Sequence, residues 1–225
     1  MSVLLDGFDE EARTQVNSAI AAAEKQTAAE ILPVVAATSG SYDRAEDIVG
    51  LWCGLTLTGV AWFLFQGVTA GSGWVSEWVV GFGFWWVLLL MLVGYVGGVV
   101  LADRVDGLRR LFAPAREMES ETVARAKAVF FDRRLHATSQ GTGVLLYVSL
   151  LERRAVVLVD DAVADKLDEK TLEEIRDELL AGLRGGSLSK GFTGGIQRVG
   201  SLLAESLPAG ENRKDEVPSE VVVLT

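Results

Sequence analysis

Two adjacent aspartates, Asp160 and Asp161, are the residues with the clearest potential for chemistry in this sequence. They end a β-rich run, and carboxylates at the end of a strand in an α/β fold can hold a divalent cation such as calcium or magnesium. They can also be solvated or cap the following helix, and we favour this reading because no third ligand is identifiable from spacing. We therefore predict no catalytic residue and no organic cofactor, with Asp160 and Asp161 as the candidate metal ligands.

Other reactive side chains are few. Cys53 and His136 are the only cysteine and histidine, which excludes an intramolecular disulfide, a multi-cysteine metal site and a site with paired histidines. We expect His136 to be exposed to solvent. The glycine-rich segment 185–195 lacks the G-K-[ST] ending that places a lysine and a hydroxyl beside bound phosphates. Its glycines are therefore interpreted as turns at helix boundaries.

A long apolar region separates the charged parts of the chain. Residues 48–102 contain one charged residue, Glu77, and all six tryptophans of the protein. A helix needs roughly 20 apolar residues to span the hydrocarbon of a bilayer. Trp74 and Trp78 flank the connector, where aromatic rings can sit at the level of the headgroups. The pattern predicts a two-pass transmembrane helical hairpin, with passes at about 48–68 and 78–102.

Basic residues near the two passes predict the orientation. Arg44 precedes the first pass, and Arg104, Arg109 and Arg110 follow the second, whereas the connector 67–78 contains no Lys or Arg. Because basic residues near membrane ends tend to stay on the cytoplasmic side, both termini should be cytoplasmic, in a plasma or inner membrane. The N-terminal residues lack the pattern of a cleaved signal peptide, so the first pass should direct insertion.

Small residues recur at small-xxx-small spacing in both passes. Gly50 and Gly54 lie in the first pass, and Gly94 and Gly98 lie in the second. Such glycines let two helix backbones approach closely. Contact within one hairpin is the favoured use, and a homo-oligomer formed through the same glycines is the alternative. A channel or carrier is disfavoured, because Glu77 is expected at the membrane edge and ion pathways normally need polar groups at depth.

The segments on both sides of the hairpin alternate between helical and strand patterns. Because residues 1–47 hold one helix and one strand, which cannot bury a core alone, they should fold with residues 103–207. Pro33 removes a ladder donor and indicates an edge or bulge position. Residues 208–225 are predicted to be a mobile tail, with a short edge strand at the terminal VVVLT as the alternative. Helices are predicted at about 10–27, 115–135, 171–184 (after a capping box at 171–174) and 188–206, and strands at 30–37, 143–150 and 154–160, the last two antiparallel.

Several stretches resemble the TPM domain family of small α/β/α sandwiches. Residues 8–11, 27–31 and 141–148 are similar to the family's helix start, its first strand and its "G-V-L" strand. Residues 185–196 are similar to the glycine-punctuated start of its last helix. Their order and spacing agree once residues 42–114 are treated as a membrane-containing insertion. The expected fold is an α/β/α sandwich with a small mixed sheet, interrupted by the two-pass hairpin.

The resemblance also carries a functional implication. The family's phosphatase label implies metal-assisted hydrolysis of phosphate esters by Asp160 and Asp161, with Glu30 as a further candidate. Many family members place the domain outside the membrane behind a signal peptide, whereas here a cytoplasmic location is predicted.

Two interpretations of function follow. The leading one is a membrane-anchored cytoplasmic module, without enzymatic activity, that binds or helps assemble a membrane-protein complex. The alternative is a weak divalent-metal-dependent phosphatase. A formal net charge of −10 at pH 7 disfavours nucleic acid as a partner, because phosphate binding depends on Lys and Arg.

Overall fold

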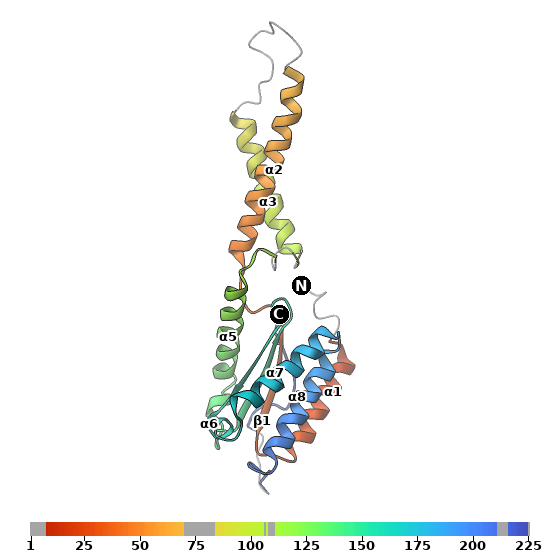
Figure 1. The fold of residues 1–225 in the computed structure, drawn as a ribbon, viewed down its shortest axis with the longest axis vertical. Helices are drawn as coiled ribbons and strands as arrows, with labels where there is room; N and C mark the ends of the chain where they lie inside the picture. The colour runs from red at the N-terminus through yellow and green to blue at the C-terminus, as the bar shows by residue number, and fades with distance from the viewer. Residues whose placement is uncertain (1–7, 70–83, 106, 108–110, 211–215, 225) are drawn as a thin grey trace. The chain divides into compact units, whose positions relative to one another are not determined.

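The computed structural model describes residues 8–69, 84–105, 107, 111–210 and 216–224. The chain divides into two compact units (Figure 1). One, here called the α/β unit, consists of Met1–Gly40 and Ala115–Thr225, and the other, the hairpin unit, consists of Ser41–Pro114. Residues 41–47 and 103–114 therefore group with the hairpin. The α/β unit is assembled from two segments that are far apart in the sequence.

A four-stranded mixed sheet forms the centre of the α/β unit. Its order is β3-β2-β1-β4, where β1 is Glu30–Ala36, β2 is Gly143–Ser149, β3 is Arg154–Val159 and β4 is Val222–Leu224. β1 is parallel to β2 and to β4, whereas β2 and β3 are antiparallel. The predicted mixed sheet and the predicted antiparallel hairpin are thus confirmed.

Helices cover both faces of this sheet (Figure 1). α1 (Glu10–Glu24), α7 (Glu169–Arg184) and α8 (Leu188–Leu203) contribute to one apolar core, together with the short helix α6 (Asp161–Ala164). α5 (Ala115–Asp132) and the 3-10 turn η1 (Leu135–Ala137) contribute to a second core on the other face. The unit is therefore an α/β/α sandwich.

The alternating direction of side chains along the strands explains why the sheet contributes to two cores. In β1, Ile31 and Val35 belong to the first core, whereas Leu32 and Val34 belong to the second. This division follows from the period of two in a strand, which points successive side chains to opposite faces. Every residue of β1 and β2 is buried, as expected for strands covered by helices on both faces.

Pro33 lies at a position where the sheet loses nothing from its missing N–H. Glu30 donates its N–H to Thr142 on the β2 side, and Ala37 donates to Leu224 on the β4 side. The alternation of directions along a strand therefore points the nitrogen of Pro33 to the β4 side, but β4 begins only opposite Val34. The predicted edge position is correct for this half of β1, although the rest of β1 lies inside the sheet.

The C-terminal segment is partly ordered against β1. Val222–Leu224 form β4, and the N–H of Val221 donates to Asn17 Oδ1 at 2.9 Å. The prediction of a mobile tail over residues 208–225 is therefore wrong for this stretch, and the alternative of a short edge strand is correct. A strand of three apolar residues is a weak sequence signal, and here a parallel neighbour supplies its hydrogen bonds.

The hairpin unit contains two long helices, α2 (Asp43–Thr69) and α3 (Phe84–Arg104). They pack through glycines. A Cβ added to Gly94 would lie 2.7 Å from the Cα of Gly54, and one added to Gly98 would lie 2.8 Å from the Cα of Gly50. The four glycines are thus used within one hairpin. The connector with Trp74, Glu77 and Trp78, and the basic residues Arg109 and Arg110, lie outside the described residues, as does the side chain of Arg44.

Candidate functional site

Asp160 and Asp161 lie where β3 ends and α6 begins. Asp160 is the N-cap of α6, and its Oδ1 accepts the N–H of Asp161 at 3.0 Å. Its other carboxylate oxygen, Oδ2, is buried and has no hydrogen-bond partner among the described residues. Asp161 is exposed in the first turn of α6. The capping interpretation therefore describes Asp160, and the two carboxylates have different surroundings.

The residues present do not fit a divalent cation. Calcium takes six to eight oxygen ligands, and magnesium needs near-octahedral geometry. Within the described ranges, no group of three or more His, Cys, Asp or Glu side chains is arranged to hold a metal ion. The unpartnered Oδ2 of Asp160 is one candidate ligand without the others.

Glu30 lies in the same row of the sheet as Asp160, but a strand separates the two residues. Glu30 is opposite Gly143 of β2, and the N–H of Asp160 donates to the carbonyl of Gly143 at 2.9 Å. Two strand spacings amount to roughly 10 Å. A Cβ at Gly143 would meet the backbone of Leu135, so main chain fills the space above this glycine. The fold does not join Glu30 and Asp160 into one site.

The remaining predicted features are structural. His136 is exposed, and its ring lies 4.6 Å from that of Phe131. In the glycine-rich segment, Gly186 has a φ of +69° just after α7, a conformation that favours glycine. A Cβ added to Gly182 would lie 2.5 Å from the Cα of Gly191. Gly186 agrees with the turn interpreted from the sequence, whereas Gly191 lies inside α8 and allows a close contact with α7 that was not predicted.

A buried polar cluster at the carboxyl ends of β1 and β2 was not identified from the sequence. Glu152 is 3 % exposed, and its Oε1 accepts the N–H of Ser39 at 2.8 Å. The hydroxyl of Ser39 lies 2.9 Å from those of Tyr147 and Ser149, and Ser149 donates to Glu152 Oε2. Burial, and the carboxylate of Glu152, raise the pKa of Tyr147, against the opposing effect of the Ser39 hydrogen bond.

This cluster lies at the ends of two strands, where Tyr147, Ser149 and Glu152 are buried. The sequence feature that points to this cluster is Glu152 in the short connection between β2 and β3. A glutamate at such a position is equally consistent with a turn exposed to solvent. The cluster has a structural role, because its hydrogen bonds connect Ser39, which follows β1, to the turn between β2 and β3.

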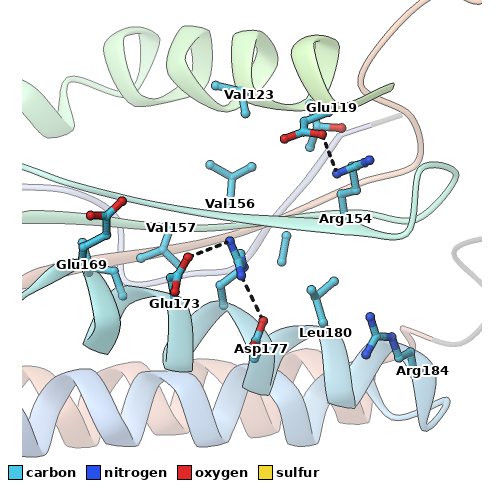
Figure 2. A pocket seen from close by; sticks show the side chains of 14 residues that line it. Glu119, Val123, Arg154, Val156, Val157, Glu169, Glu173, Asp177, Leu180 and Arg184 are labelled. Atoms are coloured by element: carbon cyan, nitrogen blue, oxygen red, sulfur yellow. Dashed lines mark hydrogen bonds and ion pairs between the residues drawn. The ribbon is translucent and has the colours of Figure 1, made fainter. Parts of the chain in front are cut away.

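A hollow of about 580 Å³ follows β3 between α5 and α7 (Figure 2). Its centre is apolar, and its walls carry charges. Arg154 pairs with Glu119 of α5 at 3.4 Å, and Arg176 of α7 lies 3.3 Å from Asp177. We call this hollow the β3 groove. Its apolar lining residues are Val123, Ala155, Val156, Val157, Leu172 and Leu180.

The hairpin unit presents large apolar side chains outward. Phe63 is 79 % exposed and Trp85 is 78 % exposed. Two stretches among the described residues are long and apolar enough to cross a membrane by length and composition, Glu46–Leu64 and Phe84–Arg104. Only 17 % and 11 % of their most apolar windows are buried, whereas a core helix of a soluble protein is mostly buried.

Comparisons with known proteins bear on the fold. The chain is similar to the NMR structure of the BA42 protein from the psychrophilic bacterium Bizionia argentinensis, with 16 % identity and a TM-score of 0.54. The similarity covers 96 % of this chain and 94 % of that one. No curated protein matches the sequence. Residues 110–202 match the model of the TPM domain family, which agrees with the sandwich described above. The family match shows that this chain contains a TPM domain, whose fold is that of the α/β unit.

Proposed function

We propose that α2 and α3 anchor the chain in a lipid bilayer and that the TPM domain is a cytoplasmic docking module for a membrane-protein partner. The outward apolar surface of α2 and α3 supports the anchoring in a bilayer. Burial of a large apolar side chain is worth roughly 1.5–3 kcal/mol relative to exposure to water. More than half of each of four large side chains is exposed, namely Trp52, Phe63, Trp85 and Leu92. Contact with lipid would remove the cost of exposing them to water.

The form of the hairpin also supports insertion. Only helices and closed barrels satisfy every backbone polar group inside hydrocarbon, and α2 and α3 are continuous helices. Their glycine-mediated contact is typical of membrane helices, which associate through small residues because lipid gives no hydrophobic drive between them. In addition, the hydroxyl of Thr56 donates to the carbonyl of Trp52 at 2.7 Å within α2, so this polar group is bonded inside its own helix.

The cytoplasmic placement rests on the basic residues beside the passes. Arg104 ends α3, and Arg116 follows shortly after in α5. Positive charges next to membrane ends favour the cytoplasmic side. Both termini would then be cytoplasmic, because two passes return the chain to the side where it started.

Docking is supported over catalysis by the arrangement of polar groups in the TPM domain. The candidate metal ligands do not converge, and the cluster around Glu152 is buried. By contrast, the β3 groove combines an apolar centre with charged walls, which is the general anatomy of a protein interface. Hydrolysis of phosphate esters would instead need several ligands and an activated water.

The anchoring is tested by labelling with a membrane-impermeant maleimide in a Cys53→Ser background. Ser72→Cys in the connector should react in intact cells, whereas Ser201→Cys, which is exposed on α8, should react only after permeabilisation. The reverse pattern would overturn the orientation. Release of the chain from membranes by alkaline carbonate would overturn the anchoring itself.

The phosphatase alternative has its own test. Calorimetric titration of calcium and magnesium into detergent-purified protein is compared with the Asp160→Asn/Asp161→Asn variant, after circular dichroism shows that both are folded. We expect no stoichiometric binding that depends on these residues. Tight binding lost in the variant would replace the docking proposal with metal-dependent chemistry.

A further inference from the structure

The β3 groove lies along an unpaired edge of the sheet. β3 is the first strand in the order β3-β2-β1-β4, so among the described residues only β2 pairs with it. A free edge exposes backbone donors and acceptors that can pair with another strand. Figure 2 shows β3 between the two walls of the groove, with Val123 and Glu119 on the α5 side and Glu173, Asp177 and Leu180 on the α7 side.

The register identifies which backbone groups face outward. The N–H of Asp160 donates to Gly143 of β2, and alternate residues of an antiparallel pair share this direction. Val156 and Leu158, opposite Tyr147 and Leu145, therefore point their N–H and C=O groups to β2. The corresponding groups of Ala155, Val157 and Val159 point away from β2, and Ala155 and Val157 line the groove, where a further strand would meet them.

Charge at the two ends of the groove is of opposite sign. Glu169 at the start of α7 and Arg184 at its end both line the hollow, and they lie at opposite ends of it (Figure 2). Neither side chain makes an ion pair or hydrogen bond with another described residue. The groove thus follows β3 and has an unpaired acid at one end and an unpaired base at the other.

We propose that the partner is a second copy of this chain, paired antiparallel through β3 about a twofold axis at Val156. The second copy places its Arg184 beside Glu169 and its Glu169 beside Arg184, so that each unpaired charge meets its opposite. Ala155 of each copy hydrogen-bonds with Val157 of the other, and the two sheets become one of eight strands. An interface of this symmetry uses the same patch on both subunits.

The apolar lining fits this occupant. An added strand is covered by α5 on one face and α7 on the other, so it should be apolar on both faces. β3 itself has this character, since its sequence from Ala155 to Val159 is Ala-Val-Val-Leu-Val. This inference rests on the docking role proposed above, but it does not depend on membrane anchoring.

Disulfide cross-linking of the full chain in detergent tests the geometry, in a Cys53→Ser background with a mild oxidant. At the twofold axis, Val156 of one copy lies opposite Val156 of the other in a non-hydrogen-bonded pair. The two Cα atoms are then about 4.5 Å apart, which is within the range that a disulfide bridges. Val156→Cys should form a covalent dimer. Val157→Cys is the matched control, because it faces Ala155 of the other copy and lies beyond about 7 Å from its own counterpart. Absence of the Val156→Cys dimer, or cross-linking of Val157→Cys alone, would overturn the proposal.

Charge reversal tests the same pairing without relying on cysteines. Glu169→Arg and Arg184→Glu should each weaken self-association about three- to tenfold, as two exposed ion pairs are lost per dimer. Mixing the two variants should restore association, because both contacts between residue 169 of one copy and residue 184 of the other are then between opposite charges. Two weak homodimers that do not mix would contradict the model. Sedimentation velocity in detergent gives the readout. A folded, membrane-inserted chain that stays monomeric would overturn self-pairing alone, and the labelling experiment reports separately on anchoring.

Discussion

Three aspartates in this protein cap helices by accepting backbone N–H groups. Asp9, Asp160 and Asp168 each accept an N–H at the start of a helix. Side-chain oxygens at this position satisfy donors that the helix leaves free. The capping box predicted at 171–174 is wrong in its detail, because α7 begins two residues earlier and Asp168 is its cap. Several polar residues in succession offer alternative caps, and the structure uses the first.

Asp168→Ala should lower the thermal midpoint of unfolding, whereas Asp168→Asn should largely retain it, because asparagine also caps helices. Hydrogen bonding from Thr171 lowers the pKa of Asp168 below its ordinary value. A lowered pKa in the folded state means that the stabilisation is present above the ordinary pKa and is lost as pH falls through the folded value. Acid unfolding followed by circular dichroism should therefore show less dependence on pH below 4 in Asp168→Ala. An unchanged acid profile would contradict this role.

Tyr147→Phe should destabilise the TPM domain at neutral pH by about 1 kcal/mol, through loss of the hydrogen bond with Ser39. The pKa of Tyr147 is raised above its ordinary value of 10.0 by burial. A raised pKa means that the stabilisation is present below the ordinary value and is lost as pH rises through the folded value. Urea unfolding at pH 8 and pH 11 measures both effects. The wild type should lose more stability than the variant at the higher pH, and equal losses would argue against a buried phenol.

Elements of this fold meet through close backbone contacts that only glycine allows. α7 and α8 approach at Gly182 and Gly191, and α2 and α3 approach at Gly54 and Gly94. Contact between the glycines of α2 and α3 was the favoured prediction from the sequence, whereas the contact between Gly182 and Gly191 is found only in the structure. For Gly54 and Gly94 the pairing is within the chain. The β3 edge is the surface that a second copy would use.

Gly94→Ala should loosen the hairpin, because the added Cβ would lie 2.7 Å from the Cα of Gly54. Overpacking of this kind costs typically about 1–3 kcal/mol. Gly97→Ala is the matched control on the same helix, where a Cβ meets nothing within 4 Å. Thermal unfolding of detergent-purified protein should show a lower midpoint for Gly94→Ala only. Equal midpoints would mean that α2 and α3 do not approach at these glycines.

The TPM domain is completed by segments from both sides of the hairpin. β1 comes from the N-terminal segment, while β2, β3 and β4 come from the C-terminal one. Helices α1 and α8 also pack together across this gap in the sequence, where a Cβ on Gly200 would lie 2.9 Å from that of Ala23. Neither segment alone contains a complete core.

Replacement of residues 41–114 by a flexible linker should therefore give a soluble, folded TPM domain. A Cβ on Gly40 would lie 3.0 Å from the Cγ of Glu121, and Glu121 follows Ala115 by six positions on α5, about 9 Å along the helix. A Gly/Ser linker of about eight residues spans this distance. Cooperative unfolding and dispersed NMR signals would agree with this expectation. Aggregation with linkers of every length would show that the hairpin unit is required for folding.

The sequence alone predicts most helices and strands and the apolar segment that interrupts the TPM domain. Helix and strand patterns are local in the sequence, and the apolar segment is long enough to recognise. Periodicity predicts the helices, β-rich runs predict three strands, and the apolar length of residues 48–102 predicts two passes. Tertiary structure decides what those signals leave open. It places Asp160 as a cap rather than in a cluster of ligands, because candidate carboxylates such as Glu30 lie on a different strand. It also makes Val222–Leu224 a strand through pairing with β1, and it leaves β3 as a free edge, since strand order depends on contacts between residues far apart in the chain.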